Sequence, residues 1–224
     1  MNKEAFLNRI ATQIGRPRPL TQAPPRDVVG APDFWHDFNL SPDERLARFE
    51  ERFTGLGGEV RVVDDIAQLQ AELAHVMADK KPKRIGMWND AELEKWVGNS
   101  LHSQAVMTWG VDPRQQFSSI DIGITGCSGA IADTGTLVLT CGGGRGRSVH
   151  LLPSIHIAVV GASQIVTRLG EALERVAKPT EMDSYVHFVT GPSRSSDIEN
   201  DQTIGIHGPA AVMAMVVREA LFLA

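Results

Sequence analysis

Apolar residues recur at helical spacing in the first half of the chain, with short apolar runs between them. The spacing predicts four helices. The first covers residues 2–14, and the second runs from Ser41 to about Thr54. The third begins after Asp64 or Asp65, and the fourth begins after Asn89. The runs predict strands at Glu59–Val63, Arg84–Met87 and Ala105–Thr108. Helices and strands that alternate in this way form a parallel sheet with helices on its faces.

Strand patterns are denser in the second half of the chain. We expect strands at residues 119–124, 136–140, 155–160, 185–190, 203–207 and 211–217. A helix is expected among them at Ser163–Val176, with Ile165, Leu169, Leu173 and Val176 on its inner face. Short links between the strands favour antiparallel or mixed pairing there. The sequence therefore predicts an α/β fold with a mixed, largely parallel sheet flanked by helices.

Proline density separates the N-terminal segment from the rest of the chain. Five prolines lie between residues 15 and 33, a density that forbids regular secondary structure. We expect an N-terminal helix and a proline-rich arm over residues 1–33, followed by a single α/β domain over residues 34–224.

Composition restricts the class of protein. The formal net charge is −5, which argues against a nucleic-acid-binding surface, since that needs concentrated basic residues. The first residues lack the apolar core of a secretion signal, and no stretch approaches the ~20 apolar residues of a membrane span. We therefore expect a cytoplasmic protein that contacts no membrane. Two cysteines, Cys127 and Cys141, are too few to hold an ordinary iron–sulfur cluster within this chain.

The run from residue 120 to residue 140 carries the densest candidate chemistry. An alternating strand ends in a turn rich in glycine and hydroxyls, and a second apolar strand begins soon after. Small polar residues at the end of a buried strand let the backbone approach a ligand. Asp133 is a candidate acid or base, although an ordinary β-turn is the alternative reading of this motif. The candidate ligand-binding residues here are Thr125, Gly126, Thr134, Gly135 and Thr136.

Two further polar loops follow strands. Residues 142–147 read Gly-Gly-Gly-Arg-Gly-Arg, and such a loop can wrap an anion through its amides, with the arginines Arg145 and Arg147 adding charge. A flexible surface loop is the alternative. Ser193, Arg194 and Asp197 offer a hydroxyl, a guanidinium and a carboxylate within one short segment. We expect Arg194 to hold an anion, and a structural ion pair between Arg194 and Asp197 is the alternative.

A histidine closes another strand beside Gly208-Pro209. His207 is a candidate acid or base, although a lone histidine is more often structural. His150 and His156 lack the compact spacing of metal ligands, and no metal site is predicted. Cys127 is expected to be a packed residue rather than a nucleophile. The loops together predict one polar site at the strand ends, with a small carboxylate or a phosphate-bearing molecule as its ligand.

Five of these motifs occur in a fixed order that resembles a known family. They are Gly-Ile-Thr-Gly (123–126), Ala-Asp-Thr-Gly-Thr (132–136), the run 151–160, Thr-Gly-Pro-Ser-Arg (190–194) with Asp-Ile-Glu (197–199), and Gly-x-His-Gly-Pro (205–209). In this order they resemble the lactate-utilisation (LUD) domain family, and within it the lactate-utilisation protein C group. The resemblance is dense from about residue 119 to residue 217.

The resemblance implies a fold similar to that of sugar-phosphate isomerases and coenzyme-A transferases. It also implies an accessory role, without a cluster of its own, in oxidation of L-lactate to pyruvate beside partner proteins that carry iron–sulfur clusters. Any cofactor of this chain itself is left unspecified. The alternative is a stand-alone isomerase or acyl- or CoA-type transferase that acts on a phosphorylated or CoA-linked small molecule, because fold similarity alone does not fix the reaction.

Overall fold

The computed structural model describes residues 2–20, 22, 39–101, 105–177, 183–196 and 202–219. Contacts within the chain divide it into two compact units, Met1–Phe38 and Asn39–Ala224. The first unit contains helix α1 (Lys3–Gln13), which begins where the side chain of Asn2 accepts a hydrogen bond from the Ala5 amide. The apolar side chains of α1 are largely exposed within this unit.

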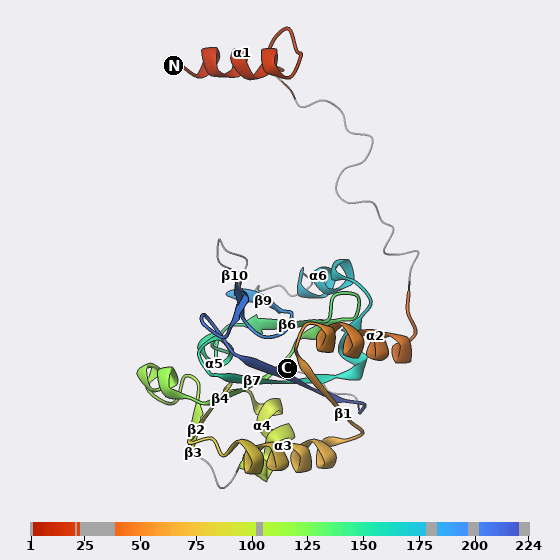
Figure 1. Cartoon of the computed structure of the whole chain (residues 1–224), viewed down its shortest axis with the longest axis vertical. Helices are drawn as coiled ribbons and strands as arrows, with labels where there is room; N and C mark the ends of the chain where they lie inside the picture. The colour runs from red at the N-terminus through yellow and green to blue at the C-terminus, as the bar shows by residue number, and fades with distance from the viewer. Residues whose placement is uncertain are drawn as a thin grey trace. The chain divides into compact units, whose positions relative to one another are not determined.

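The second unit is built on a six-stranded sheet in which every neighbouring pair is parallel (Figure 1). The strand order is β1-β12-β7-β4-β2-β3. The strands are β1 (Glu59–Val63), β2 (Arg84–Met87), β3 (Ala105–Thr108), β4 (Ile122–Gly126), β7 (Ile155–Gly161) and β12 (Ala211–Val217). The predicted α/β fold with a largely parallel sheet flanked by helices is confirmed.

Helices cover both faces of this sheet. Helix α3 (Ile66–Lys80) packs with α4 (Ala91–Val97) on one face, and α2 (Pro42–Gly55) and α5 (Ser148–Leu151) lie on the other (Figure 1). The buried side of α2 consists of Leu46, Phe49 and Phe53, at the predicted helical spacing.

Helix α2 begins at Ser41 as predicted, and a capping box forms its start. Ser41 accepts from the Glu44 amide, and the Glu44 carboxylate accepts from the Ser41 amide at 2.8 Å. The start predicted after Asn89 is displaced by one residue. Asp90 is the N-cap of α4, because its carboxylate accepts from the amides of Glu92 and Leu93.

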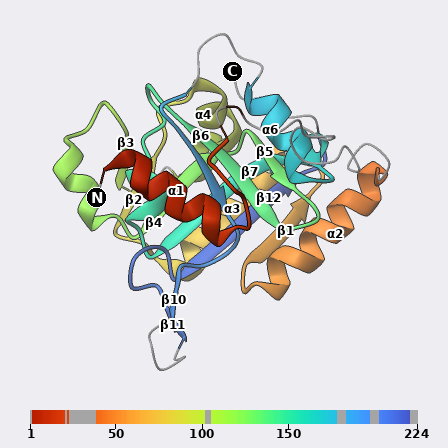
Figure 2. The same cartoon turned by 90° about the horizontal axis from the view of Figure 1, so that it is seen from above.

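A smaller four-stranded sheet forms a further layer, and Figure 2 shows it from above. Its order is β8-β5-β6-β9, with β6 antiparallel to both of its neighbours and β5 parallel to β8. Its strands are β5 (Gly129–Ile131), β6 (Thr136–Cys141), β8 (Ile165–Val166) and β9 (Tyr185–Val189). Strands β10 (Arg194–Ser196) and β11 (Gln202–Ile204) pair as an antiparallel hairpin that projects from the unit.

The helix predicted at Ser163–Val176 is wrong in its first half. A 3-10 turn, η4 (Ala162–Gln164), leads into strand β8, and α6 covers only Leu169–Ala177. The reason is tertiary, because Ile165 and Val166 are β-branched and pair with β5 in the small sheet. Leu169 and Leu173, predicted to face inward, are 47% and 48% exposed.

The strand predicted at 119–124 also begins later than expected. Residues Arg114–Ser119 form a 3-10 helix, η3, and β4 starts at Ile122. Both cysteines are free and buried. Burial raises the pKa of the Cys127 thiol far above its usual range, which agrees with the expected packing role. Among the described helices, none has the length and apolar character needed to cross a bilayer.

Candidate functional site

The order of the strands marks one position on the edge of the large sheet. Strands β2 and β4 are neighbours, but the chain leaves β2 towards β3 on one side and leaves β4 towards β7 on the other. In open α/β sheets, ligands bind outside the carboxyl ends of the strands at such a switch point. The relevant ends here are Met87 and Gly126.

The glycine-rich loop 142–147 lies against this position. The Asn89 amide donates to the Gly144 carbonyl at 3.0 Å, and the Trp88 indole N–H donates to the Gly146 carbonyl at 2.9 Å. A Cβ at Gly144 would overlap the backbone of Asn89, and one at Gly146 would overlap the ring of Trp109. Only glycine allows this approach. The loop therefore holds Arg145 at the switch point, together with Arg147.

Helix α5 runs from this loop across the face of the large sheet. It lies so close that a Cβ at Gly123 of β4 would overlap the Val149 carbonyl oxygen. This approach brings His150 into the space between the two sheets, where it is 1% exposed. The edge of its ring faces Trp88, with ring centroids 6.2 Å apart.

Three histidines meet between the sheets, and we call them the histidine line. Nε2 of His150 lies 3.0 Å from Nδ1 of His187 on β9. The ring of His150 lies 5.6 Å from that of His156 on β7, measured between centroids. Nε2 of His156 lies 2.8 Å from the hydroxyl of Thr125 on β4. The line runs from the half-buried His187 to the fully buried His156.

The environment keeps these rings neutral. Burial lowers the pKa of His150 to about 3, and the neighbouring His187 adds to the effect. Burial also lowers the pKa of His156 well below its usual range. The pKa of His187 is lowered by partial burial and by the guanidinium of Arg147. In the described part of the chain, Nδ1 of His150 and Nδ1 of His156 have no hydrogen-bond partner.

Tyr185 and Arg147 form the outer end of the line. The Arg147 guanidinium lies 4.4 Å from the centroid of the Tyr185 ring, and that ring meets His187 edge-on at 6.2 Å. Burial and the nearby Asp183 carboxylate raise the pKa of the Cys141 thiol to about 11, while Arg145 and Arg147 oppose the rise. Cys141 therefore stays a thiol at neutral pH.

The predicted residues Asp133 to Thr136 lie elsewhere, against the end of α2. The Asp133 carboxylate lies 3.4 Å from Nη1 of Arg48 on α2 and 3.9 Å from Nε of Arg168. The hydroxyls of Thr134 and Thr136 are 2.7 Å apart, and that of Thr136 is 3.1 Å from the hydroxyl of Thr190. Gly135 has a φ of +59°, and a Cβ there would lie 2.5 Å from the amide nitrogen of Phe53.

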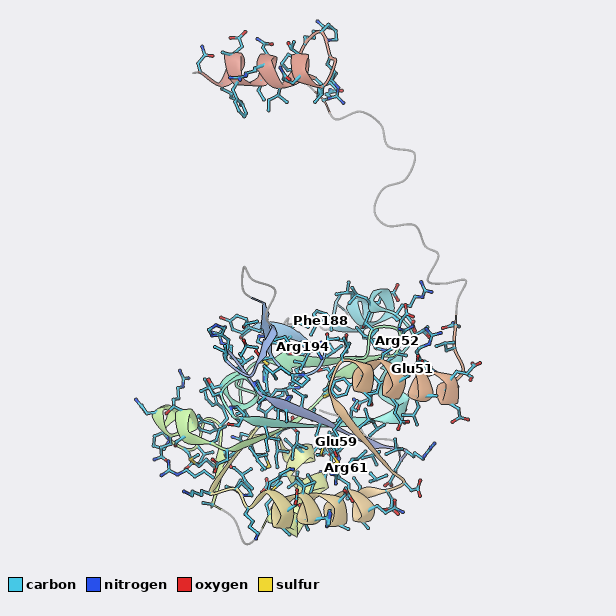
Figure 3. The ribbon with its side chains drawn as sticks, in the orientation of Figure 1. Glu51, Arg52, Glu59, Arg61, Phe188 and Arg194 are labelled. Atoms are coloured by element: carbon cyan, nitrogen blue, oxygen red, sulfur yellow. The ribbon has the colours of Figure 1, made fainter. Side chains whose placement is uncertain are left out.

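Arg194 also contacts the end of α2. Its guanidinium donates to the Leu56 carbonyl, and Figure 3 labels Arg194. A cation beside the last carbonyls of a helix stabilises it. The backbone of Ser193 is tied to its surroundings, since its amide donates to the Pro209 carbonyl and its carbonyl accepts from Gly205. Asp197 lies outside the described residues.

His207 lies at a third place. It is exposed and lines a pocket of about 310 Å³ beside the amino ends of β7 and β12. The rest of the lining is Leu151, Leu152, Pro153, Ser154, Gly205, Ile206, Gly208 and Ala210. Among the described residues, no group of three or more histidine, cysteine or carboxylate side chains is arranged to hold a metal ion.

The predicted candidates are thus divided among separate places. One group lies at the end of α2 and consists of Asp133, Thr134, Gly135, Thr136 and Arg194. His207 lines the pocket beside β7 and β12, and Ser193 lies next to Gly208 of that pocket. Thr125 belongs to the histidine line, Gly126 ends β4, and Arg145 belongs to the glycine-rich loop. Sequence reasoning named Arg147 as a charge of the glycine-rich loop, but it did not select His150, His187 or Tyr185 as site residues. Their sequence clue is the alternation of Tyr185 and His187 along β9, which points both side chains to one face.

Together, the parallel sheet, the smaller sheet stacked on it and the neutral histidines between them define a two-sheet α/β domain with a polar site between its layers. The LUD domain model matches residues 46–217. The chain belongs to the LUD domain family.

Similar proteins cover nearly the whole chain. Lactate utilization protein C of Halalkalibacterium halodurans is 29% identical over 97% of this chain and 98% of its own length. That of Shouchella clausii is 30% identical over 96% of this chain and 97% of its own length. The crystal structure of a DUF162 family protein from Deinococcus radiodurans superposes with a TM-score of 0.59 at 26% identity, and it covers 80% of this chain and 99% of its own.

Proposed function

We propose that this protein acts in lactate utilisation, as a subunit that supports oxidation of L-lactate to pyruvate. The observation that carries the proposal is the likeness to proteins named Lactate utilization protein C over 96–97% of the chain. That likeness spans both units of the chain rather than a single motif. A shared fold alone would support the proposal much less, because one fold hosts many reactions.

In this proposal the redox centres belong to partner proteins. An iron–sulfur cluster takes about four thiolate ligands. This chain has two cysteines, and both are buried thiols with raised pKa values. We therefore infer that iron–sulfur subunits exchange the electrons, while this cluster-free subunit, which we take to be cytoplasmic, binds a small ligand.

The test is affinity purification of the full chain, tagged at its N-terminus, from its native cells grown on L-lactate. We expect mass spectrometry to identify cysteine-rich partners and the eluate to show the brown absorbance of iron–sulfur clusters. Cells grown on glucose are the control. Two results together would refute the proposal: a colourless eluate without partners, and undiminished growth on L-lactate of a separate strain from which the gene is deleted.

In this proposal His207 or Asp133 moves a proton and Arg194 holds the anionic ligand, and these roles are tested in the same cells. His207 is exposed, so His207→Gln should fold normally, and loss of growth on L-lactate would support its role in moving a proton. Asp133→Asn and Arg194→Gln each remove a charge that also contacts α2, so their thermal stability must be measured alongside growth. Full growth of a stable variant would exclude the role of that residue.

A further inference from the structure

We propose that Arg147, Tyr185 and His187, with the buried His150 as a positioning residue, bind a small carboxylate that carries an oxygen on its second carbon. The ligand class rests on the proposed function, since L-lactate and pyruvate are both of this kind. The site itself rests on the geometry between the two sheets. It is distinct from the residues at the end of α2 and from the pocket that contains His207.

The first argument is uncompensated charge. Arg145 and Arg147 are held by a loop whose glycines are packed against Asn89 and Trp109. Within the described ranges, neither arginine forms an ion pair with a carboxylate. The Arg147 guanidinium is oriented by its stacking on Tyr185. A planar guanidinium held in this way suits a carboxylate, whose two oxygens can accept two N–H bonds in parallel.

The second argument is the tautomer of the histidine pair. Both rings are neutral at neutral pH, so each carries one N–H. Nδ1 of His150 is buried without a partner in the described structure, and a buried orphan N–H costs more than a buried orphan lone pair. The N–H of His150 therefore belongs on Nε2, where it donates to Nδ1 of His187 across 3.0 Å.

This tautomer fixes what the site presents to a ligand. If Nδ1 of His187 accepts, its proton lies on Nε2, which points away from His150. His187 is then a neutral N–H donor beside a cation, and Tyr185, whose ring meets that of His187, carries a hydroxyl that can also donate. All three groups favour oxygen acceptors. In the bound state, the carboxylate would pair with Arg147 while His187 would donate to the oxygen on the second carbon.

The experiment follows histidine side-chain nitrogens by NMR in the full ¹⁵N-labelled chain at pH 7. The spectrum of His187→Gln identifies the His187 signals. We expect His187 to be protonated on Nε2, and its signals to shift and saturate with L-lactate or pyruvate. Acetate, which lacks the second oxygen, should bind at least about 10-fold more weakly. Arg147→Gln should weaken L-lactate binding about 10-fold, which corresponds to about 1.4 kcal/mol.

Matched variants separate this site from general effects. Arg114 also stacks on an aromatic ring, 5.6 Å from the centroid of Trp109, so Arg114→Gln is the control for Arg147→Gln and should bind normally. His150→Gln keeps an N–H that can donate to His187, whereas His150→Phe has none. We expect the Nε2–H form of His187 and L-lactate binding to persist in the first variant and to be lost in the second.

Three results would overturn the proposal. These are saturable L-lactate shifts at His207 in place of His187, unchanged affinity in Arg147→Gln, and tighter binding of inorganic phosphate than of L-lactate. The outcome is independent of the partner test. Recovery of iron–sulfur partners with no L-lactate binding would reject this site and leave the proposed function standing. L-lactate binding by a protein that recovers no iron–sulfur partners would support this site and reject the proposed function.

Discussion

Gly123 has no Cβ atom, and this lets α5 lie directly on the sheet. Gly123→Ala would push its Cβ into the Val149 carbonyl oxygen and against Pro153. We expect a loss of about 3 kcal/mol in the free energy of unfolding, because backbone on both sides must shift. Urea titration followed by circular dichroism measures it.

The matched control is Gly55→Ala. Nothing lies within 4 Å of a Cβ at Gly55, which is the last residue of α2. This change should stabilise the protein by about 0.5 kcal/mol. Equal stability of the two alanine variants would show that α5 does not need Gly123.

The histidine line makes stability depend on pH. Unfolded histidine takes up a proton near pH 6.5, but in the folded protein burial lowers the pKa of His150 to about 3 and that of His156 well below 6.5. Below pH 6.5 the unfolded state therefore binds more protons than the folded state, so stability falls as pH falls, and for His150 this continues to about pH 3. Each such histidine contributes about 1.4 kcal/mol per pH unit.

Urea midpoints at pH 7, 6 and 5 measure this dependence. His150→Phe should reduce the slope by about 1.4 kcal/mol per pH unit and leave the contribution of His156, whereas His75→Gln, a change at an exposed position on α3, should leave the slope unchanged. A midpoint that stays constant between pH 7 and pH 5 would contradict the buried, neutral state of these rings.

Among the elements, α2 connects the two sheets, since it packs on β1 and on β8. Its first turn depends on the reciprocal bonds between Ser41 and Glu44. Ser41→Ala should cost about 1 kcal/mol of stability, because amides of the first turn lose their acceptor. Glu44→Gln is the control, since glutamine can also cap the Ser41 amide. Thermal unfolding of both variants tests the cap, and equal melting temperatures would argue against it.

Elements with strong local patterns could be predicted from the sequence. The bounds of β1, β2, β3 and β12 agree with the predicted runs, because each strand is a short, largely apolar segment between breaks in the pattern. The helix predicted around Ile165 was wrong, because the apolar residues there have helical spacing but the β-branched ones pair with β5 as a strand. The local sequence does not show whether tertiary pairing makes this segment a helix or a strand.

The site was less predictable than the elements. Arg145 and Thr125 were selected from their glycine-rich surroundings, which reflect real close approaches of backbone. The pairing of His150 with His187 was not predicted, because the two residues come together only when α5 crosses the sheet and β9 is stacked above it. Their spacing along the chain therefore gives no clue to their contact.

At the scale of the whole molecule, the contacts of the chain form two units. We expect a fragment of residues 39–224 to fold alone, because both sheets and the clusters of buried apolar side chains lie within it. It should show one cooperative urea transition and the far-ultraviolet circular dichroism of an α/β domain. The full chain is the reference, and a fragment without a cooperative transition would contradict the division.

The position of β12 has a consequence for how the protein is made. Of the six strands of the large sheet, β12 is the last to be synthesised, yet it lies between β1 and β7, and Val217 pairs with both Val63 and Gly161. Until β12 emerges, the edges of β1 and β7 that β12 pairs in the finished sheet are therefore unpaired, and such edges attract other chains. Premature termination or slow translation before Val217 should thus lead to aggregation, and chaperones have the most to protect in the interval before β12 emerges.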